Sequence, residues 1–238
     1  MRRTAITGAA ALAAALALVL SGCGSDTKTE PSTSESETTT STTTTARAEP
    51  TTTAKVAPRE EDAAGPNPTI ASYIAENQIQ ETPVKPGDAG APTIDLPIPQ
   101  GWEPAGENKP EWAYGAIVYT GPEAEEYSPS IVALLSKLTG NVDPQQIIDL
   151  APGELQNLPG WEASNDGRTS TLGEYPAYQL AGTWESEGKR KIVAQKTVVI
   201  PGADGLYVLQ LNADGLENQR DLVNAATEVI DAETKITP

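Results

Sequence analysis

The pattern of hydrophobic and polar positions divides this chain into three parts. An uncharged apolar run extends from Ala5 to Leu20, a polar stretch follows to about residue 65, and amphipathic segments fill residues 66–238. Only the third part has apolar residues at the regular spacing that a buried core requires. Its length is ordinary for one domain, so we expect a single globular domain over 66–238.

Strand patterns dominate the second half of this domain. Ser130 to Leu138 contains a run that is apolar on both faces, which is typical of a central strand covered on both sides. Three longer strands separated by short turns are predicted after it. Prolines place the first predicted strand at a sheet edge. The predicted strands are 93–98, 114–120, 130–138, 175–185, 189–200 and 206–213.

Helical signals accompany these strands. Asn67-Pro68 and Asp143-Pro144 each join a capping residue to a proline, so helices are predicted over 68–78 and from residue 144. A last helix is predicted over 216–230. The elements together predict an α+β fold, a mostly antiparallel sheet meander with helices packed on it. The residues expected to be buried in the last helix are Leu222, Ala226, Val229 and Ile230.

The N-terminus has the features of a secretory signal. Two arginines precede the apolar run, which is too short and too rich in alanine for a membrane span, and the small pair Ser21-Gly22 follows it. Cys23, the single cysteine of the chain, comes next. This arrangement resembles the lipobox of bacterial lipoproteins, which implies a signal peptide over 1–22 and a diacylglyceryl group on Cys23 as the first mature residue. The alternatives are an ordinary signal peptide with an incidental cysteine and, for the arginine pair, a twin-arginine signal.

Residues 23–65 are predicted to be a disordered tether that begins with the lipidated cysteine. Thr, Ser, Pro and Glu dominate this stretch, and almost no apolar residue is present to offset the entropy of ordering it. The composition also permits O-glycosylation. The alternative is a passive spacer.

Composition excludes several classes of function. The chain has no His, and its one Cys is expected to be consumed by acylation, so His-dependent catalysis, thiol catalysis and His or Cys metal sites are excluded. We expect no enzyme activity, no metal and no cofactor. The formal net charge of −17 repels nucleic acid and anionic membrane surfaces. Acyl chains on Cys23 are therefore expected to provide the membrane contact.

Aromatic residues supply the candidate ligand site. Trp102, Trp112 and Tyr114 lie close together in a segment rich in Gly and Pro, and such rings suit the boundary between the sugar and the acyl chain of a glycolipid. The alternative is that these rings pack in the core. The basic cluster Lys189-Arg190-Lys191 is expected to be the solvated end of a hairpin, or alternatively to meet an acidic partner or lipid head groups.

Several longer strings of residues resemble the LpqN lipoprotein family of mycobacteria, over essentially the whole of 66–238. The resemblance implies a fold like that of Mog1 and PsbP, an α/β/α sandwich with an antiparallel sheet between helical layers. It brings no catalytic motif. The strings are Ala-Gly-Pro-Asn-Pro-Thr-Ile (64–70), Ile-Gln-Glu-Thr-Pro-Val (79–84), Pro-Thr-Ile-Asp-Leu-Pro (92–97), Leu-Leu-Ser-Lys-Leu-Thr-Gly (134–140), Ala-Pro-Gly-Glu-Leu (151–155), Val-Ala-Gln-Lys-Thr-Val-Val-Ile-Pro (193–201) and Val-Leu-Gln-Leu-Asn-Ala-Asp (208–214).

The resemblance also implies an accessory role in building the mycolic-acid envelope. The expected function is a non-catalytic lipoprotein on the outer face of the cell membrane, with partial release to the cell wall or medium. Its expected partners are trehalose-mycolate glycolipids, envelope transport or acyl-transfer proteins, and host proteins. Two alternatives stay open: a purely protein-binding adaptor, including a host-interaction role, and a hydrolase that uses only carboxylates.

Overall fold

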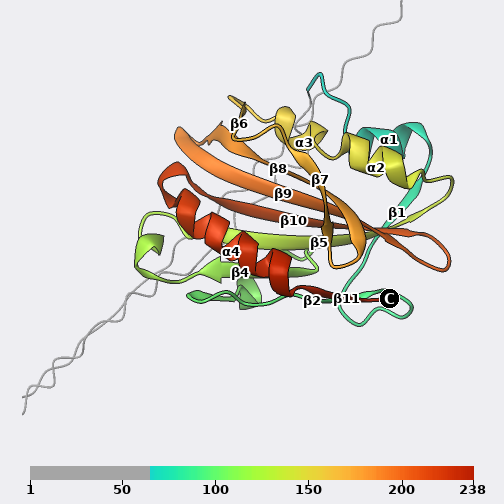
Figure 1. The fold of residues 1–238 in the computed structure, drawn as a ribbon, viewed down its shortest axis with the longest axis horizontal. Coiled ribbons are helices and arrows are strands. Elements are labelled where there is room, and N and C mark those ends of the chain that lie inside the picture. Colours follow the sequence, from blue (N-terminus) through green and yellow to red (C-terminus); the bar gives the residue numbers. More distant parts are fainter. Residues whose placement is uncertain (1–64) are drawn as a thin grey trace, which may run out of the picture. The chain divides into compact units, whose positions relative to one another are not determined.

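The computed structural model describes residues 65–238. The predicted signal peptide (1–22), the predicted acylation at Cys23 and nearly all of the tether lie outside the described residues. Within 65–238, a large antiparallel sheet carries helices on both faces (Figure 1). None of the helices in this range is long and apolar enough to cross a bilayer.

Nine strands form the main sheet of the described part. Their order is β3-β4-β5-β10-β9-β8-β6, with β1 also paired to β5 and β7 also paired to β8. All pairs are antiparallel. The strands are β1 (Gln80–Pro83), β3 (Trp102–Pro104), β4 (Gly115–Tyr119), β5 (Ser130–Thr139), β6 (Glu162–Ala163), β7 (Arg168–Leu172), β8 (Tyr175–Ser186), β9 (Lys189–Pro201) and β10 (Leu206–Leu216).

The long central strands bury side chains on both faces of this sheet. In β9, Val198 and Ile200 belong to one hydrophobic cluster, whereas Val199 between them belongs to another. Successive side chains of a strand point to opposite faces, so the sheet has a separate core on each side. In β5, Ile131 and Ala133 likewise belong to one cluster and Val132 between them to another, which confirms the expectation that the run in 130–138 is a central strand covered on both faces.

Three helices lie on one face of the sheet and a longer helix lies on the other (Figure 1). The first face carries α1 (Ile70–Glu76), α2 (Pro144–Leu150) and α3 (Gly153–Gln156), and the opposite face carries α4 (Arg220–Glu233). Three short 3-10 turns complete the helical elements: η1 (Gly106–Asn108), η2 (Pro122–Ala124) and η3 (Glu217–Gln219). The α/β/α layering expected from the sequence is therefore present.

Helix α1 begins later than predicted. Thr69, rather than Asn67, caps it through a reciprocal pair of hydrogen bonds with Ser72. The Asn67 side chain instead donates to Asn157 beside α3, with 3.0 Å between Nδ2 and Oδ1. The predicted cap of α2 is confirmed, since Asp143 accepts a hydrogen bond from the Gln145 amide.

Helix α4 also begins later than the predicted residue 216, because β10 continues to Leu216 and η3 follows it. Its buried residues are Val223, Ala226 and Ile230, while Leu222 and Val229 are only half-buried. The prediction of buried residues is therefore confirmed for Ala226 and Ile230 and wrong for Leu222 and Val229. The reason is that the helix packs on the sheet through a face centred on Ala226. A side chain at Gly215 would bring a Cβ atom to 3.0 Å from Val223, so this glycine allows the close approach of α4.

A second, two-stranded sheet joins the predicted edge strand to the C-terminus. Strand β2 (Thr93–Asp95) is shorter than the predicted 93–98 and pairs with β11 (Lys235–Thr237) rather than with the main sheet. Pro97 and Pro99 follow directly and cannot donate backbone hydrogen bonds, which explains the early end.

Candidate functional site

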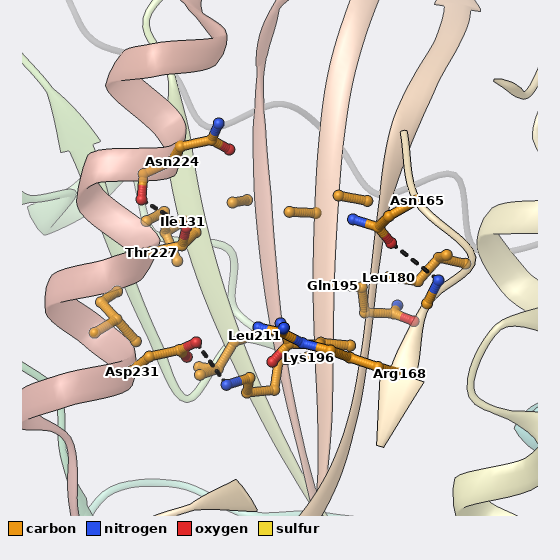
Figure 2. Close-up of a pocket in the computed structure, with 16 residues that line it drawn as sticks. Ile131, Asn165, Arg168, Leu180, Gln195, Lys196, Leu211, Asn224, Thr227 and Asp231 are labelled. Atoms are coloured by element: carbon orange, nitrogen blue, oxygen red, sulfur yellow. Dashed lines mark hydrogen bonds and ion pairs between the residues drawn. The ribbon is translucent and has the colours of Figure 1, made fainter. Parts of the chain in front are cut away.

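A groove of about 330 Å³ lies on the α4 face of the main sheet (Figure 2). Helix α4 forms one wall through Asn224, Thr227 and Asp231, and the segment from Asn165 to Arg168 forms the other. Strands β5, β10, β9 and β8 make the floor between these walls. The groove is therefore built from segments of the chain that are far apart in the sequence.

The hollow in the floor comes from a transverse row of small side chains. Ala181 of β8 lies opposite Ala194 of β9, which lies opposite Ala213 of β10, and Ile131 of β5 ends the row. Directly paired residues present their side chains on the same face of a sheet. Three adjacent alanines leave space beneath α4 that larger apolar residues would fill.

The next row along the strands is polar at one end. Register places Arg168, Gln179, Lys196 and Leu211 side by side on four neighbouring strands. Lys196 Nζ lies 2.6 Å from Asp231 Oδ2 on α4, and this ion pair connects the floor to the helical wall. The Lys196 side chain is 9% exposed, whereas that of Asp231 is 39% exposed. The groove thus joins an apolar floor to a charged end.

The wall opposite α4 depends on a glycine. Asn165 Oδ1 accepts a hydrogen bond of 3.0 Å from the Gly167 amide, which closes a turn at Asn165-Asp166-Gly167. Gly167 has φ +70°, and a Cβ atom there would lie 2.2 Å from Tyr178 Oη. Both the backbone conformation and the space therefore require glycine at this point of the wall.

This arrangement is suited to holding an amphipathic molecule. An apolar chain on the alanine row would be removed from water, and the polar end would contact a head group. The volume is at the lower end of the range for ligand pockets, about 300–1,000 Å³, so it suits part of a long acyl chain. Among residues 65–238, no group of three acidic, His or Cys side chains is placed to hold a metal ion.

The three predicted aromatic site residues do not line this groove. Trp102 and Tyr114 are buried in the large core cluster, where Trp102 packs edge to face on Tyr119 at 5.8 Å and the Tyr114 hydroxyl accepts a hydrogen bond from the Ile94 amide. Trp112 is partly buried against a different cluster. The structure therefore does not bring all three together, and their contact with a ligand stays a prediction.

The basic cluster at 189–191 is engaged within the domain. Lys189 pairs with Glu126 at 3.0 Å, and Arg190 forms ion pairs with Glu162 and Glu217. Lys191 is buried. The expected solvated hairpin end is therefore found in part: Lys189 and Arg190 lie at the end of the β8–β9 hairpin with partly exposed side chains, whereas Lys191 is buried.

Lys191 is buried and belongs to a polar cluster with the half-buried residues Tyr127 and Asp214. The Tyr127 hydroxyl donates to Asp214, and Lys191 Nζ lies 4.8 Å from the centre of the Tyr127 ring. Burial, opposed by the Tyr127 hydrogen bond and the Lys191 charge, raises the pKa of the Asp214 carboxyl above its ordinary value. Burial is also the main cause of the raised pKa of Tyr127. This cluster connects the segment before β5 to β9 and β10.

Sequence reasoning missed the groove because its residues share no local motif. One signal was available: Lys196 lies at an inward position within the apolar run of β9, where a charge requires a partner. The alanine row cannot be recognised in the sequence, because it depends on the register of three strands.

Comparison with known proteins identifies relatives of this domain. The family described as "Probable lipoprotein LpqN" matches residues 66–237. Lipoprotein LpqN of Mycobacterium tuberculosis is 53% identical over 178 residues, which is 74% of this chain and 77% of that protein. A solved structure described as "Crystal structure of LpqN involved in cell envelope biogenesis of Mycobacterium tuberculosis" has 52% sequence identity and a TM-score of 0.69. It covers 73% of this chain and 100% of the crystallised chain.

These matches cover nearly all of the described residues and include both walls and the floor of the groove. They agree with the family indicated by the strings of residues in the sequence. The chain belongs to the LpqN lipoprotein family.

Proposed function

We propose that this chain is a membrane-anchored lipoprotein that binds an acylated sugar lipid of the trehalose-mycolate type and thereby supports construction of the cell envelope. The single observation that supports this proposal is the groove, with its alanine floor and charged end. The crystallised relative is described as involved in cell envelope biogenesis, which agrees with such a role.

Binding to this groove requires no chemistry on the ligand. Apolar surface removed from water contributes about 25 cal/mol per Å², less the entropy of immobilising the chain. A groove of this volume holds only part of a long acyl chain, so its affinity is modest and the ligand can be exchanged. Exchange suits a protein that presents lipids to envelope transport or acyl-transfer proteins, the partners that we propose.

The test is titration of trehalose 6-dodecanoate into the protein, followed by calorimetry. A chain that starts at residue 65 is a suitable sample, because the crystallised relative corresponds over its whole length to 73% of this chain. We expect saturable binding without turnover of the ester. Ala194→Leu, which fills the middle of the alanine row, is expected to weaken binding at least about tenfold, as a blocked apolar subsite should.

The matched control is Ala225→Leu, at an exposed position of α4 that does not line the groove. It adds the same atoms and should leave the affinity unchanged, and circular dichroism checks that both variants are folded. Absence of binding to the wild-type protein would favour the protein-adaptor function instead. Equal weakening by both variants would mean that the ligand does not occupy the groove.

A further inference from the structure

The charged end of the groove has an excess of positive charge. The whole chain has a formal net charge of −17, yet two cations and one carboxylate line the groove: Arg168, Lys196 and Asp231. A local reversal of sign on an acidic protein raises the local concentration of negatively charged ligands. The neutral head group of an acylated sugar does not require it.

We propose that the groove preferentially binds an anionic amphiphile, an acyl chain with a carboxylate or phosphate in its head group, which Arg168 and Lys196 hold. This rests on one part of the proposed function, that an acyl chain lies over the alanine row, and it adds that an anionic head group binds more tightly than a neutral one. Carboxylate and phosphate share the property that matters here, two or more anionic oxygens that accept charge-assisted hydrogen bonds.

Arg168 is placed and available for such a contact. Its Cα lies opposite Gln179 in β8, so its side chain is on the groove face, and Figure 2 shows it extending across the floor in the direction of Lys196. It is exposed and has no side-chain hydrogen bond or ion pair with any residue of 65–238. A free guanidinium presents a planar set of donors that matches both carboxylate and phosphate.

Lys196 is the second cation, and its ion pair with Asp231 fixes the position of its side chain. Arg168 and Lys196 are two strands apart on the same face, roughly 10 Å between backbones, which two long side chains can span around one head group. Asp231 is more exposed than Lys196, so it can turn towards water when another anion binds. A ligand anion therefore competes with Asp231 for a lysine that is already positioned.

The test compares three amphiphiles with the same chain length. Dodecanoate and dodecyl phosphate carry the two kinds of anion, and dodecyl maltoside is neutral. Each is titrated below its micelle concentration, by calorimetry, into the wild-type protein and into Arg168→Gln, Asp231→Asn and Lys189→Gln. The last variant removes one cation outside the groove, so it controls for the change in net charge.

We expect Arg168→Gln to weaken binding of at least one anion about tenfold, the loss of a charge-assisted hydrogen bond, and to change maltoside binding less than about twofold. Asp231→Asn should strengthen anion binding several-fold, because Lys196 loses its competing carboxylate. If the ion pair only stabilises the structure, Asp231→Asn should instead weaken the binding of all three ligands. Whichever anion responds more strongly to Arg168→Gln identifies the head group.

The outcomes separate this inference from the proposed function. Equal effects of Arg168→Gln and Lys189→Gln on the anions, or no strengthening in Asp231→Asn, would overturn the inference. Binding of acylated trehalose together with that result would leave the proposed function standing. Anion binding without any binding of acylated trehalose would support the inference and refute the sugar lipid as ligand. Failure of every amphiphile to bind would overturn both.

Discussion

At the scale of single residues, Asp214 connects the stability of the domain to pH. It is held between Tyr127 and Lys191, and burial keeps the pKa of its carboxyl above the ordinary value. Folding therefore favours the protonated form. The contribution of protonated Asp214 to the free energy of unfolding is complete below the pKa of an unfolded aspartate, about 3.9. It is lost as the pH rises through the higher pKa that this carboxyl has in the folded state.

Replacing Asp214 with Asn should remove this dependence. Asn keeps an oxygen that accepts the Tyr127 hydrogen bond but cannot ionise. Relative to the wild type, the free energy of unfolding of Asp214→Asn is expected to increase as the pH rises from about 4 and then to level off. Urea unfolding at a series of pH values measures this difference. A difference that stays constant with pH would show that Asp214 is not perturbed by folding.

Asp204→Asn is the matched comparison, with the opposite sign. Asp204 is an exposed carboxylate 2.7 Å from Lys137, and its hydrogen bond to that lysine lowers the pKa of the carboxyl. The contribution of ionised Asp204 to the free energy of unfolding is present above the pKa of an unfolded aspartate. It is lost as the pH falls through the lower pKa that this carboxyl has in the folded state. The effect should be small, because exposed ion pairs contribute little and are screened by salt.

At the scale of elements, strand β11 connects the end of the chain to the segment before β3. Ile236 pairs with Ile94, which is buried in the large core cluster, and Ile236 itself is half-buried against that cluster. A three-residue strand has little pairing energy of its own, so its position depends on this one apolar contact.

Ile236→Ala is therefore expected to lower the free energy of unfolding by about 1–2 kcal/mol, less than a fully buried isoleucine would. Lys235→Ala and Thr237→Ala change exposed neighbours in the same strand and should stay within about 0.5 kcal/mol of the wild type. Thermal or urea unfolding of the three variants provides the comparison. Equal losses in all three would mean that backbone pairing, rather than the Ile236 side chain, holds the strand.

At the scale of the whole molecule, the proposed function requires that the domain be kept at a membrane. Two acyl chains, each with about 0.8 kcal/mol per buried methylene, would provide the anchor that we predict on Cys23. Cys23→Ala removes the acceptor of this modification and should move the protein from the detergent phase to the aqueous phase on phase separation. A variant that still enters the detergent phase would contradict acylation at this residue.

Much of the architecture was predictable because it depends on long, regular patterns. Five of the six predicted strands, those after residue 110, correspond to β4, β5, β8, β9 and β10. Strands β1, β3, β6, β7 and β11 were not predicted, since they have two to five residues and are mostly polar or interrupted by proline. Their conformation is imposed by pairing with neighbours, which local pattern does not reveal.

The site was much less predictable than the fold. Trp102 and Tyr114 looked suited to a ligand because they are amphipathic, but the same property suits core positions with a buried hydroxyl or indole. The groove instead depends on Ala181, Ala194 and Ala213, which are ordinary residues until pairing aligns them. Side-chain type indicates possible chemistry, whereas only strand register shows which small residues become neighbours.

The alanine row also determines how this site can change during evolution. The hollow exists because side-chain carbons are absent at three positions, while the backbone hydrogen bonds of the central strands continue beneath it. Its depth can therefore be altered by one substitution at a time, without remodelling a loop or bending the sheet. A protein with this scaffold can therefore change the width and length of the groove through single-codon steps, each of which leaves the sheet intact.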